Sequence, residues 1–194
     1  MQAALPIPLA ERLADLYRRM EEAYERVAAT IDFSCSMCPD NCCDSYFQHH
    51  TYVEWAYLWN GLAELPQATL VRLVERAADH VDGCERSLAA GERPRQMCPL
   101  NDAGLCGLYR HRLMICRMHG IPSAMTRPDG RRLEFPGCFL CQQRAGAAAG
   151  VLDRTDFYRE LVALEGQFLA TRRMTLPRLR LTIAEMIVRG APRF

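Results

Sequence analysis

The stretch CSMCPDNCC, residues 35–43, holds four cysteines within nine residues and dominates the chemistry of the chain. Cys35 and Cys38 are separated by two residues, a spacing that lets both sulfurs turn toward one metal without straining the backbone, as in zinc knuckles and iron–sulphur loops. Cys42 and Cys43 are adjacent, and adjacent side chains diverge in most backbone conformations. One of them therefore serves a second metal or a second iron of a cluster, or it is a buried thiol. Because residues 32–50 lack helical periodicity, we expect an irregular loop shaped by what its thiols bind.

A second group of cysteines lies in the segment 93–143, where five prolines exclude a long regular helix. The group consists of Cys98, Cys106, Cys116, Cys138 and Cys141. Cys138 and Cys141 repeat the two-residue gap. One arrangement open to the chain therefore pairs them in space with Cys35 and Cys38, in the manner of a zinc ribbon.

The number of cysteines bears on the cellular compartment. Ten cysteines in 194 residues are fewer than a small disulfide scaffold uses, and a chain of this length can bury a core without covalent staples. Residues 1–31 carry charged side chains throughout and show no apolar run of signal-peptide length. We therefore expect a cytoplasmic protein. In that reducing compartment clustered thiols are more often metal ligands or redox groups than disulfides.

The composition is that of an ordinary globular domain, with 49% hydrophobic residues, 24% charged residues and a formal net charge of +1. No window approaches the roughly 18 consecutive apolar residues of a membrane-spanning helix, so we expect no membrane partner. The near-neutral charge gives no long-range attraction to phosphate backbones, and we expect no nucleic-acid partner either.

His49 and His50 adjoin the first cysteine cluster, and we expect both to be exposed to solvent.

Apolar residues at helical spacing predict helices in the N-terminal half. The first helix spans residues 8–31, and a helical hairpin spans residues 51–91 with its turn at Pro66. Cys84 falls on the apolar face of the second helix of this hairpin. We expect it to be a buried core thiol rather than a ligand.

The C-terminal half predicts shorter elements. Residues 121–126 and 131–135 flank a turn sequence and predict a small β-hairpin, and one short helix fits within residues 108–116. Two helices are expected within residues 151–190, the last of them opening at Thr175.

Together these elements predict a mainly α fold. Residues 1–194 are expected to form a single domain, in which helices pack around an irregular cysteine-rich metal-binding centre at residues 32–143, with one small β-hairpin.

The order of the cysteine motifs is similar to that of a known family. After the four-thiol opening come the motifs CPL at 98–100, CGLY at 106–109 and CR at 116–117, with Arg112 before the last. This pattern resembles the YkgJ-type cysteine-cluster family, described as a zinc- or iron-chelating domain. The resemblance covers residues 35–141.

Two positions depart from the family pattern. Three residues rather than two separate Cys38 from Cys42, which alters the geometry of the opening. Leu113 stands where the family usually has proline, which changes only the loop.

The resemblance implies a set of metal ligands. Eight thiols of the family correspond to cysteines of this chain, with Cys138 favoured over Cys141 for the last position. With both members of that pair kept, the candidate metal ligands are Cys35, Cys38, Cys42, Cys43, Cys98, Cys106, Cys116, Cys138 and Cys141.

Thiolate ligation suits zinc and iron–sulphur clusters alike. Proline follows Cys38 and Cys98, as in ferredoxin-type ligand loops, where a local turn aims backbone amides at the cluster. The resemblance also extends to bacterial flagellin lysine methylases, which carry a similar cysteine cluster thought to hold an iron–sulphur centre. We therefore favour a [4Fe–4S] cluster over zinc.

These considerations give three hypotheses for the function. The first is a metal-binding protein with an iron–sulphur cluster and an electron-transfer or redox accessory role. The second is a zinc-stabilised module that binds an unidentified partner protein. The third, an enzyme that modifies proteins in the way the flagellin methylases do, needs a substrate pocket that the sequence does not locate.

Overall fold

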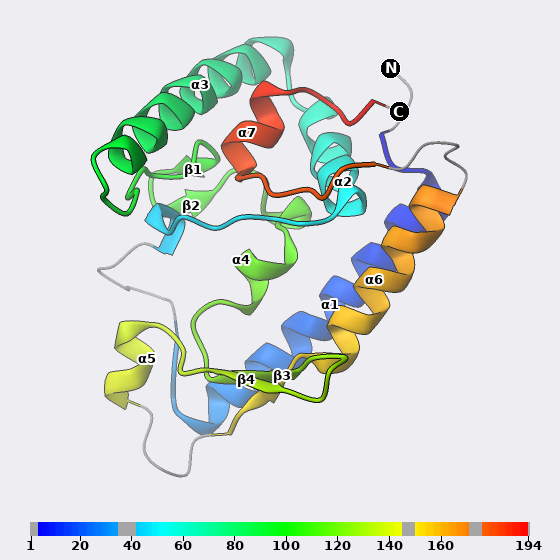
Figure 1. Ribbon diagram of the computed structural model, residues 1–194, viewed down its shortest axis with the longest axis vertical. Coiled ribbons are helices and arrows are strands. Elements are labelled where there is room, and N and C mark those ends of the chain that lie inside the picture. The colour runs from blue at the N-terminus through cyan, green and yellow to red at the C-terminus, as the bar shows by residue number, and fades with distance from the viewer. Residues whose placement is uncertain (1–3, 35–41, 145–149, 171–175, 194) are drawn as a thin grey trace. The chain divides into compact units, whose positions relative to one another are not determined.

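The computed structural model describes residues 4–34, 42–144, 150–170 and 176–193. Within these ranges the chain is mainly α-helical, with small β elements (Figure 1). The expected fold class is therefore confirmed. The chain divides into two compact units: unit 1 comprises residues 1–10, 41–113 and 165–194, and unit 2 comprises residues 11–40 and 114–164. Whether the two units fold as one domain stays a prediction.

The α-helices of the described residues are α1 (Ile7–Thr30), α2 (Tyr52–Ala63), α3 (Gln67–Ala89), α4 (Met114–Met118), α5 (Phe139–Arg144), α6 (Thr155–Ala170) and α7 (Ile183–Val188). Two short 3-10 helices are η1 (Cys42–Asp44) and η2 (Tyr109–His111). The strands are β1 (Asn101–Asp102), β2 (Leu105–Cys106), β3 (Ser123–Thr126), β4 (Arg132–Phe135) and β5 (Leu152–Asp153).

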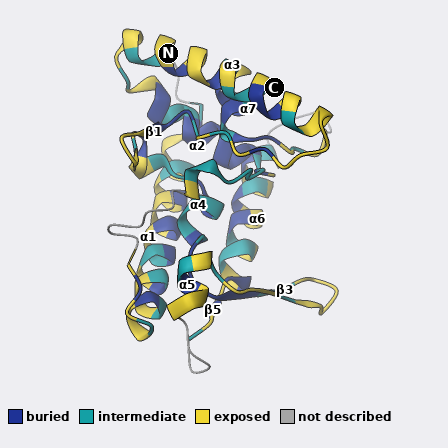
Figure 2. Ribbon diagram, turned by 90° about the vertical axis from the view of Figure 1, so that its left-hand side faces the viewer, coloured by how far each residue is buried: buried dark blue, intermediate teal, exposed yellow. Residues whose placement is uncertain are grey.

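The helical hairpin of unit 1 is confirmed. α2 is apolar around most of its circumference and is buried over residues 52–58, whereas α3 buries only a narrow stripe that includes Leu73, Ala77 and Cys84. α3 packs on α7, and its outer side is exposed (Figure 2). Cys84 is buried, as its helical register predicts.

The N-terminus of α2 is capped from a distant part of the chain. The N-cap residue, Thr51, makes no side-chain cap hydrogen bond. Instead the carboxylate of Glu165, on α6, accepts the backbone N–H groups of Tyr52 at 2.9 Å and Val53 at 2.8 Å. Two of the four backbone donors that every helix start leaves unsatisfied are thus supplied with an acceptor within unit 1.

Replacing Glu165 by Ala is expected to lower the free energy of unfolding by about 1–2 kcal/mol, because both amides lose their acceptor where the site is partly buried. Glu165→Gln keeps a side-chain oxygen that can accept from these amides. Because burial raises the pKa of Glu165, the site disfavours a negative charge, and we expect the neutral Gln to lower the free energy of unfolding by less than half as much as Ala does. Urea titration of the three proteins checks this. Equal midpoints for Glu165→Ala and the unchanged protein would show that α2 needs no such cap.

The last helix begins later than the sequence predicts. Residues 176–182 are not helical, and α7 starts after Thr182, whose side chain accepts from the backbone N–H of Glu185 while the Glu185 carboxylate accepts from the backbone N–H of Thr182. This reciprocal capping box fixes the start of the helix. Leu181 before it pairs with His49 in an antiparallel bridge, which holds the preceding segment extended. The expected opening residue, Thr175, lies outside the described residues.

His49 is buried at 3% exposure, so the expectation that it faces solvent is wrong. The bridge to Leu181 buries it: its backbone N–H donates to the Leu181 carbonyl at 2.7 Å and its carbonyl accepts from the Leu181 N–H at 3.1 Å. Burial lowers the pKa of His49 to about 4. The charge of His50 lowers this pKa further, whereas the charge of Glu54 raises it. His50 itself is exposed, as expected.

A neutral, buried His49 makes the fold sensitive to acid. Its folded-state pKa lies below its ordinary value, so its contribution to stability is present above about pH 6.5 and is lost as the pH falls toward 4. Between pH 7.5 and 4.5 we expect this one group to remove about 2–3 kcal/mol from the free energy of unfolding. Urea titrations at both pH values should show that His49→Leu abolishes that part of the loss. A variant with the same acid dependence as the unchanged protein would assign the effect to other groups.

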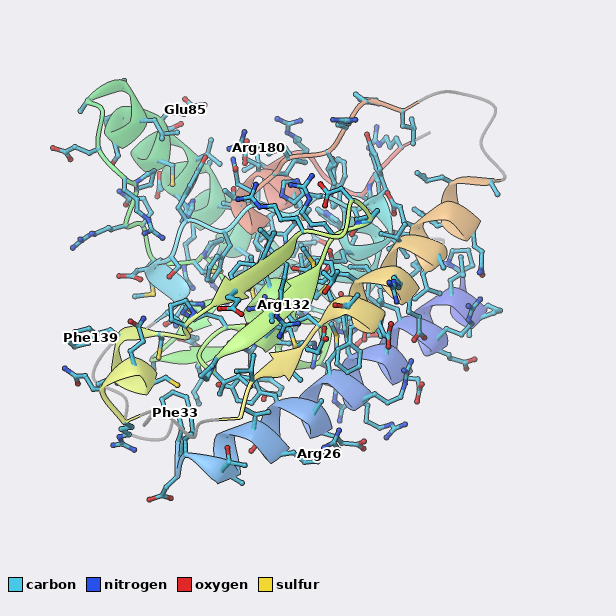
Figure 3. The ribbon with its side chains drawn as sticks, turned by 60° about the horizontal axis from the view of Figure 1, so that its bottom comes forward. Arg26, Phe33, Glu85, Arg132, Phe139 and Arg180 are labelled. Carbon is cyan, nitrogen blue, oxygen red and sulfur yellow. The ribbon has the colours of Figure 1, made fainter. Side chains whose placement is uncertain are left out.

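Unit 2 contains the predicted β-hairpin. β3 and β4 pair antiparallel from Ser123 opposite Phe135 to Thr126 opposite Arg132, which confirms it. The sequence gives no sign of β5, which adds to β3 in parallel and whose Asp153 lies 3.9 Å from Arg132 (labelled in Figure 3). The α1 and α6 segments of this unit lie side by side, with a salt bridge of 2.6 Å between Arg19 and Glu160 (Figure 1).

The prediction of a single short helix within residues 108–116 is wrong. The chain forms η2 and α4 instead, because Arg112 between them has an extended backbone with ψ of 138°. The interruption adjoins the border between the two units, at residues 113 and 114.

Candidate metal centre

Four of the nine predicted ligands lie in unit 1. We call them the unit-1 thiols: Cys42, Cys43, Cys98 and Cys106. η1 carries the first two, and the backbone N–H of Cys98 donates to the Cys43 carbonyl at 2.9 Å. Asn101 then closes a turn by donating to the Cys98 carbonyl at 2.9 Å, and it pairs with Cys106 across β1 and β2. Backbone hydrogen bonds thus gather segments that are far apart in the sequence.

The β1–β2 hairpin fixes where Cys106 lies. Ala103 and Gly104 at its turn both have positive φ, 48° and 90°, the conformation that tight two-residue hairpins require and that glycine tolerates best. The Asn101 side-chain oxygen accepts the Gly104 N–H at 3.1 Å, and the Gly107 N–H donates to the Leu100 carbonyl at 2.8 Å. These bonds hold Asn101 opposite Cys106.

The thiols differ in acidity. A hydrogen bond from Cys42 lowers the pKa of Cys43 to about 6, with further help from Asn101 and the charge of Arg112, while burial opposes the shift. Burial raises the pKa of Cys98 to about 12, and the neighbouring Cys43 and Cys106 raise it further. The pKa of Cys43 is thus shifted toward the thiolate form that binds a metal, whereas a metal would have to displace the proton of Cys98.

Polar groups surround the unit-1 thiols. The Nδ2 atom of Asn101 is buried and makes no hydrogen bond of ordinary length within the described part of the chain, although it lies near Cys43, whose pKa it helps to lower. Arg76 donates to the Asn101 carbonyl at 2.5 Å, and its charge acts on Cys98. Sequence reasoning missed these residues, because an arginine on α3 or an asparagine in a turn has no distinguishing pattern.

Three other predicted ligands belong to unit 2. We call them the unit-2 thiols: Cys116, Cys138 and Cys141. The N–H of Cys138 donates to the Gly120 carbonyl at 2.9 Å, just after α4. Gly137 has a φ of 90°, and a side chain there would meet that same Gly120 carbonyl at 2.6 Å and the Cys141 sulfur at 3.2 Å. Glycine at 137 therefore permits the close turn that leads into α5, where Cys141 is buried and Phe139 is exposed (Figure 3).

The remaining two predicted ligands, Cys35 and Cys38, lie outside the described residues. The eight described cysteines carry thiols and form no disulfide with one another. Among the described residues no three His, Cys, Asp or Glu side chains are gathered at metal-binding geometry. Backbone hydrogen bonds thus connect the segments that carry the unit-1 thiols, but the side chains themselves do not form such a group.

Comparisons of the chain with known protein families, curated proteins and solved structures gave no match. The resemblance to the YkgJ-type cysteine-cluster family stays a prediction. No helix of the described residues has both the length and the apolar character needed to cross a membrane.

The unit-1 thiols fit a soft metal centre on two observations. The donor set is thiol only, which suits zinc and iron–sulphur clusters and disfavours hard cations. The orphaned Nδ2 of Asn101 provides a buried N–H donor beside Cys43, and N–H donors to sulfur are what tune a thiolate-bound metal.

Cys84 differs from the predicted ligands. Its sulfur lies 3.5 Å from Nδ1 of His80, one turn earlier on α3. Burial raises the pKa of Cys84 and lowers that of His80, so both groups favour the neutral form and do not make a thiolate–imidazolium pair. The thiol fills space on the buried face of α3.

Proposed function

We propose that this chain is a metal-binding cysteine-cluster protein of the YkgJ type, which holds a [4Fe–4S] cluster and serves in electron transfer or as a redox accessory. The observation that carries the proposal is the backbone convergence of the unit-1 thiols from η1, the turn at Cys98 and β2. Thiolates are the usual ligands of such clusters. We place the protein in the cytoplasm, where thiols stay reduced.

Individual residues have definite parts in this proposal. The cluster would supply one-electron chemistry when bound. Cys43 offers a preformed thiolate, and Cys98 is a thiol whose proton leaves on binding, so metal uptake releases protons. Arg112 and Arg76 offset the negative charge that accumulates on the sulfurs, and the buried Nδ2 of Asn101 is available as a donor to Cys43.

Reversible reduction tests the redox role. Protein purified without oxygen is expected to be brown, with a broad visible absorption from thiolate-to-iron charge transfer that dithionite bleaches and mild oxidation restores. Electron paramagnetic resonance of the reduced sample should show a paramagnetic cluster. A colourless protein with stoichiometric zinc and no such signal would overturn the iron–sulphur assignment.

A zinc-stabilised interaction module is the second candidate. Large apolar side chains next to the thiols are exposed, including Leu105 at 76% and Tyr109 at 52%. Exposed apolar groups beside a rigid metal site suit the binding of a partner protein. This candidate predicts bound zinc that a chelator removes with loss of protease resistance in residues 42–113. Iron and sulphide in place of zinc would contradict it.

A further inference from the structure

We propose that the unit-1 thiols form a metal centre of their own, complete within unit 1 and independent of the unit-2 thiols. This inference rests on the proposed function, because it concerns how the predicted ligands are divided. The list of nine predicted ligands does not by itself decide how many metal centres they form. The division of the chain into two compact units assigns four of the described predicted ligands to one unit and three to the other.

The number and chemistry of the donors make the unit-1 set sufficient. Four thiolates complete a tetrahedral zinc site or the cysteine ligation of one iron–sulphur cluster. Cys42 and Cys43, although adjacent in sequence, have side chains that hydrogen-bond to each other, so in this 3-10 turn both thiols lie on one side of the chain. The divergence expected of adjacent cysteines does not separate them here.

Backbone hydrogen bonds connect the segments that carry the unit-1 thiols to one another. The Cys98 N–H is bonded to the Cys43 carbonyl, the turn at Cys98 leads directly into β1, and β1 pairs with the strand that ends in Cys106. Every one of these connections lies between residues 42 and 107, within unit 1. The set therefore needs no element of unit 2 to bring its members together.

The charges near the unit-1 thiols partly compensate such a centre. A divalent metal held by four thiolates carries a net charge of about −2. The guanidinium groups of Arg76 and Arg112, both from unit 1, act on Cys98 and Cys43 respectively, while the carboxylate of Asp44 acts on Cys43 in the opposite sense. The two arginines thus offset part of the negative charge that the centre would hold.

Cobalt(II) titration of the full-length, metal-free, reduced chain tests the inference, because thiolate-bound cobalt absorbs strongly and can be counted. The unchanged chain is expected to bind one equivalent in the tetrahedral four-thiolate geometry of the unit-1 thiols. Cys98→Ser should lose this equivalent. Combined replacement of the unit-2 thiols by Ser should keep it. Cys84→Ala, which removes a thiol of the same unit outside the set, should also keep it.

A single shared centre gives a different result. If the unit-2 replacement, with unchanged helical circular dichroism, releases this cobalt, or if Cys98→Ser keeps it, the inference is overturned while the proposed function survives. If the unchanged chain binds no cobalt, both fail. Should Cys98→Ser lose its helical signal, Cys106→His decides the question, since it retains a nitrogen ligand. A cobalt spectrum that Cys106→His changes and the unit-2 replacement leaves unchanged supports a separate centre, and a spectrum that both variants change contradicts it.

Discussion

Cys98→Ser is expected to lose the metal of the unit-1 thiols and, with it, about 4 kcal/mol of stability when free metal exceeds the dissociation constant about 1,000-fold. The reason is that a hydroxyl is a poor ligand for a soft metal, and that the centre ties η1 to the β1–β2 hairpin. Metal analysis after gel filtration, together with urea titration in the presence and absence of metal, measures both losses.

Cys84→Ala is the matched control for this variant. It removes a thiol from the buried face of α3, where the side chain only fills space, so we expect metal content to stay intact and stability to fall by about 1 kcal/mol. If Cys84→Ala released metal while Cys98→Ser did not, the ligand set would include α3 and the assignment of the unit-1 thiols would be wrong.

Trp55→Ala is expected to lower the free energy of unfolding by about 3–5 kcal/mol, as removal of a large buried aromatic side chain does. Trp55 on α2 is 8% exposed, and its Nε1–H lies 3.1 Å from the Met186 carbonyl and 2.9 Å from the Gly190 carbonyl, which it can share as acceptors. Met186 lies in the last turn of α7, where helical carbonyls lack partners within the helix, and Gly190 directly follows the C-cap residue Arg189. The indole thus attaches the last helix to the core of unit 1.

Trp55→Phe separates the two contributions. It keeps most of the buried ring but loses the donor, and we expect it to cost about 1–2 kcal/mol. Because the Nε1–H of Trp59 also donates to the Met186 carbonyl, at 2.9 Å, that acceptor stays satisfied and the Gly190 carbonyl is left unpaired. Urea titration followed by circular dichroism compares the variants. A Trp55→Ala midpoint equal to that of the unchanged chain would show that α7 is held by other contacts.

Sequence periodicity is sufficient where an element is long or its turn chemistry is local. α1, the α2–α3 hairpin and the β3–β4 hairpin all follow from patterns within one segment. It fails where a distant segment decides the conformation. The bridge between His49 and Leu181 buries a histidine and delays the start of α7, and the parallel pairing of β5 depends on a strand about 30 residues earlier.

The candidate centre shows the same limit. Cysteine spacing identifies the candidate ligands. The helical register of Cys84 identifies it, in addition, as a buried thiol that is not a ligand. Cysteine spacing says nothing of Asn101 or Arg76, since their positions near the sulfurs follow from the β1–β2 turn and from the packing of α3. Groups that tune a site without binding its metal carry no spacing rule.

Metal and sulphide analysis of the chain purified without oxygen tests the central claim most directly. We predict iron and acid-labile sulphide in about equal molar amounts, as a [4Fe–4S] cluster requires, and the loss of both from a chain that lacks the unit-1 and unit-2 thiols. Zinc in their place would favour the interaction module. A folded chain that contains neither iron nor zinc, and takes up neither when they are supplied, would contradict the account.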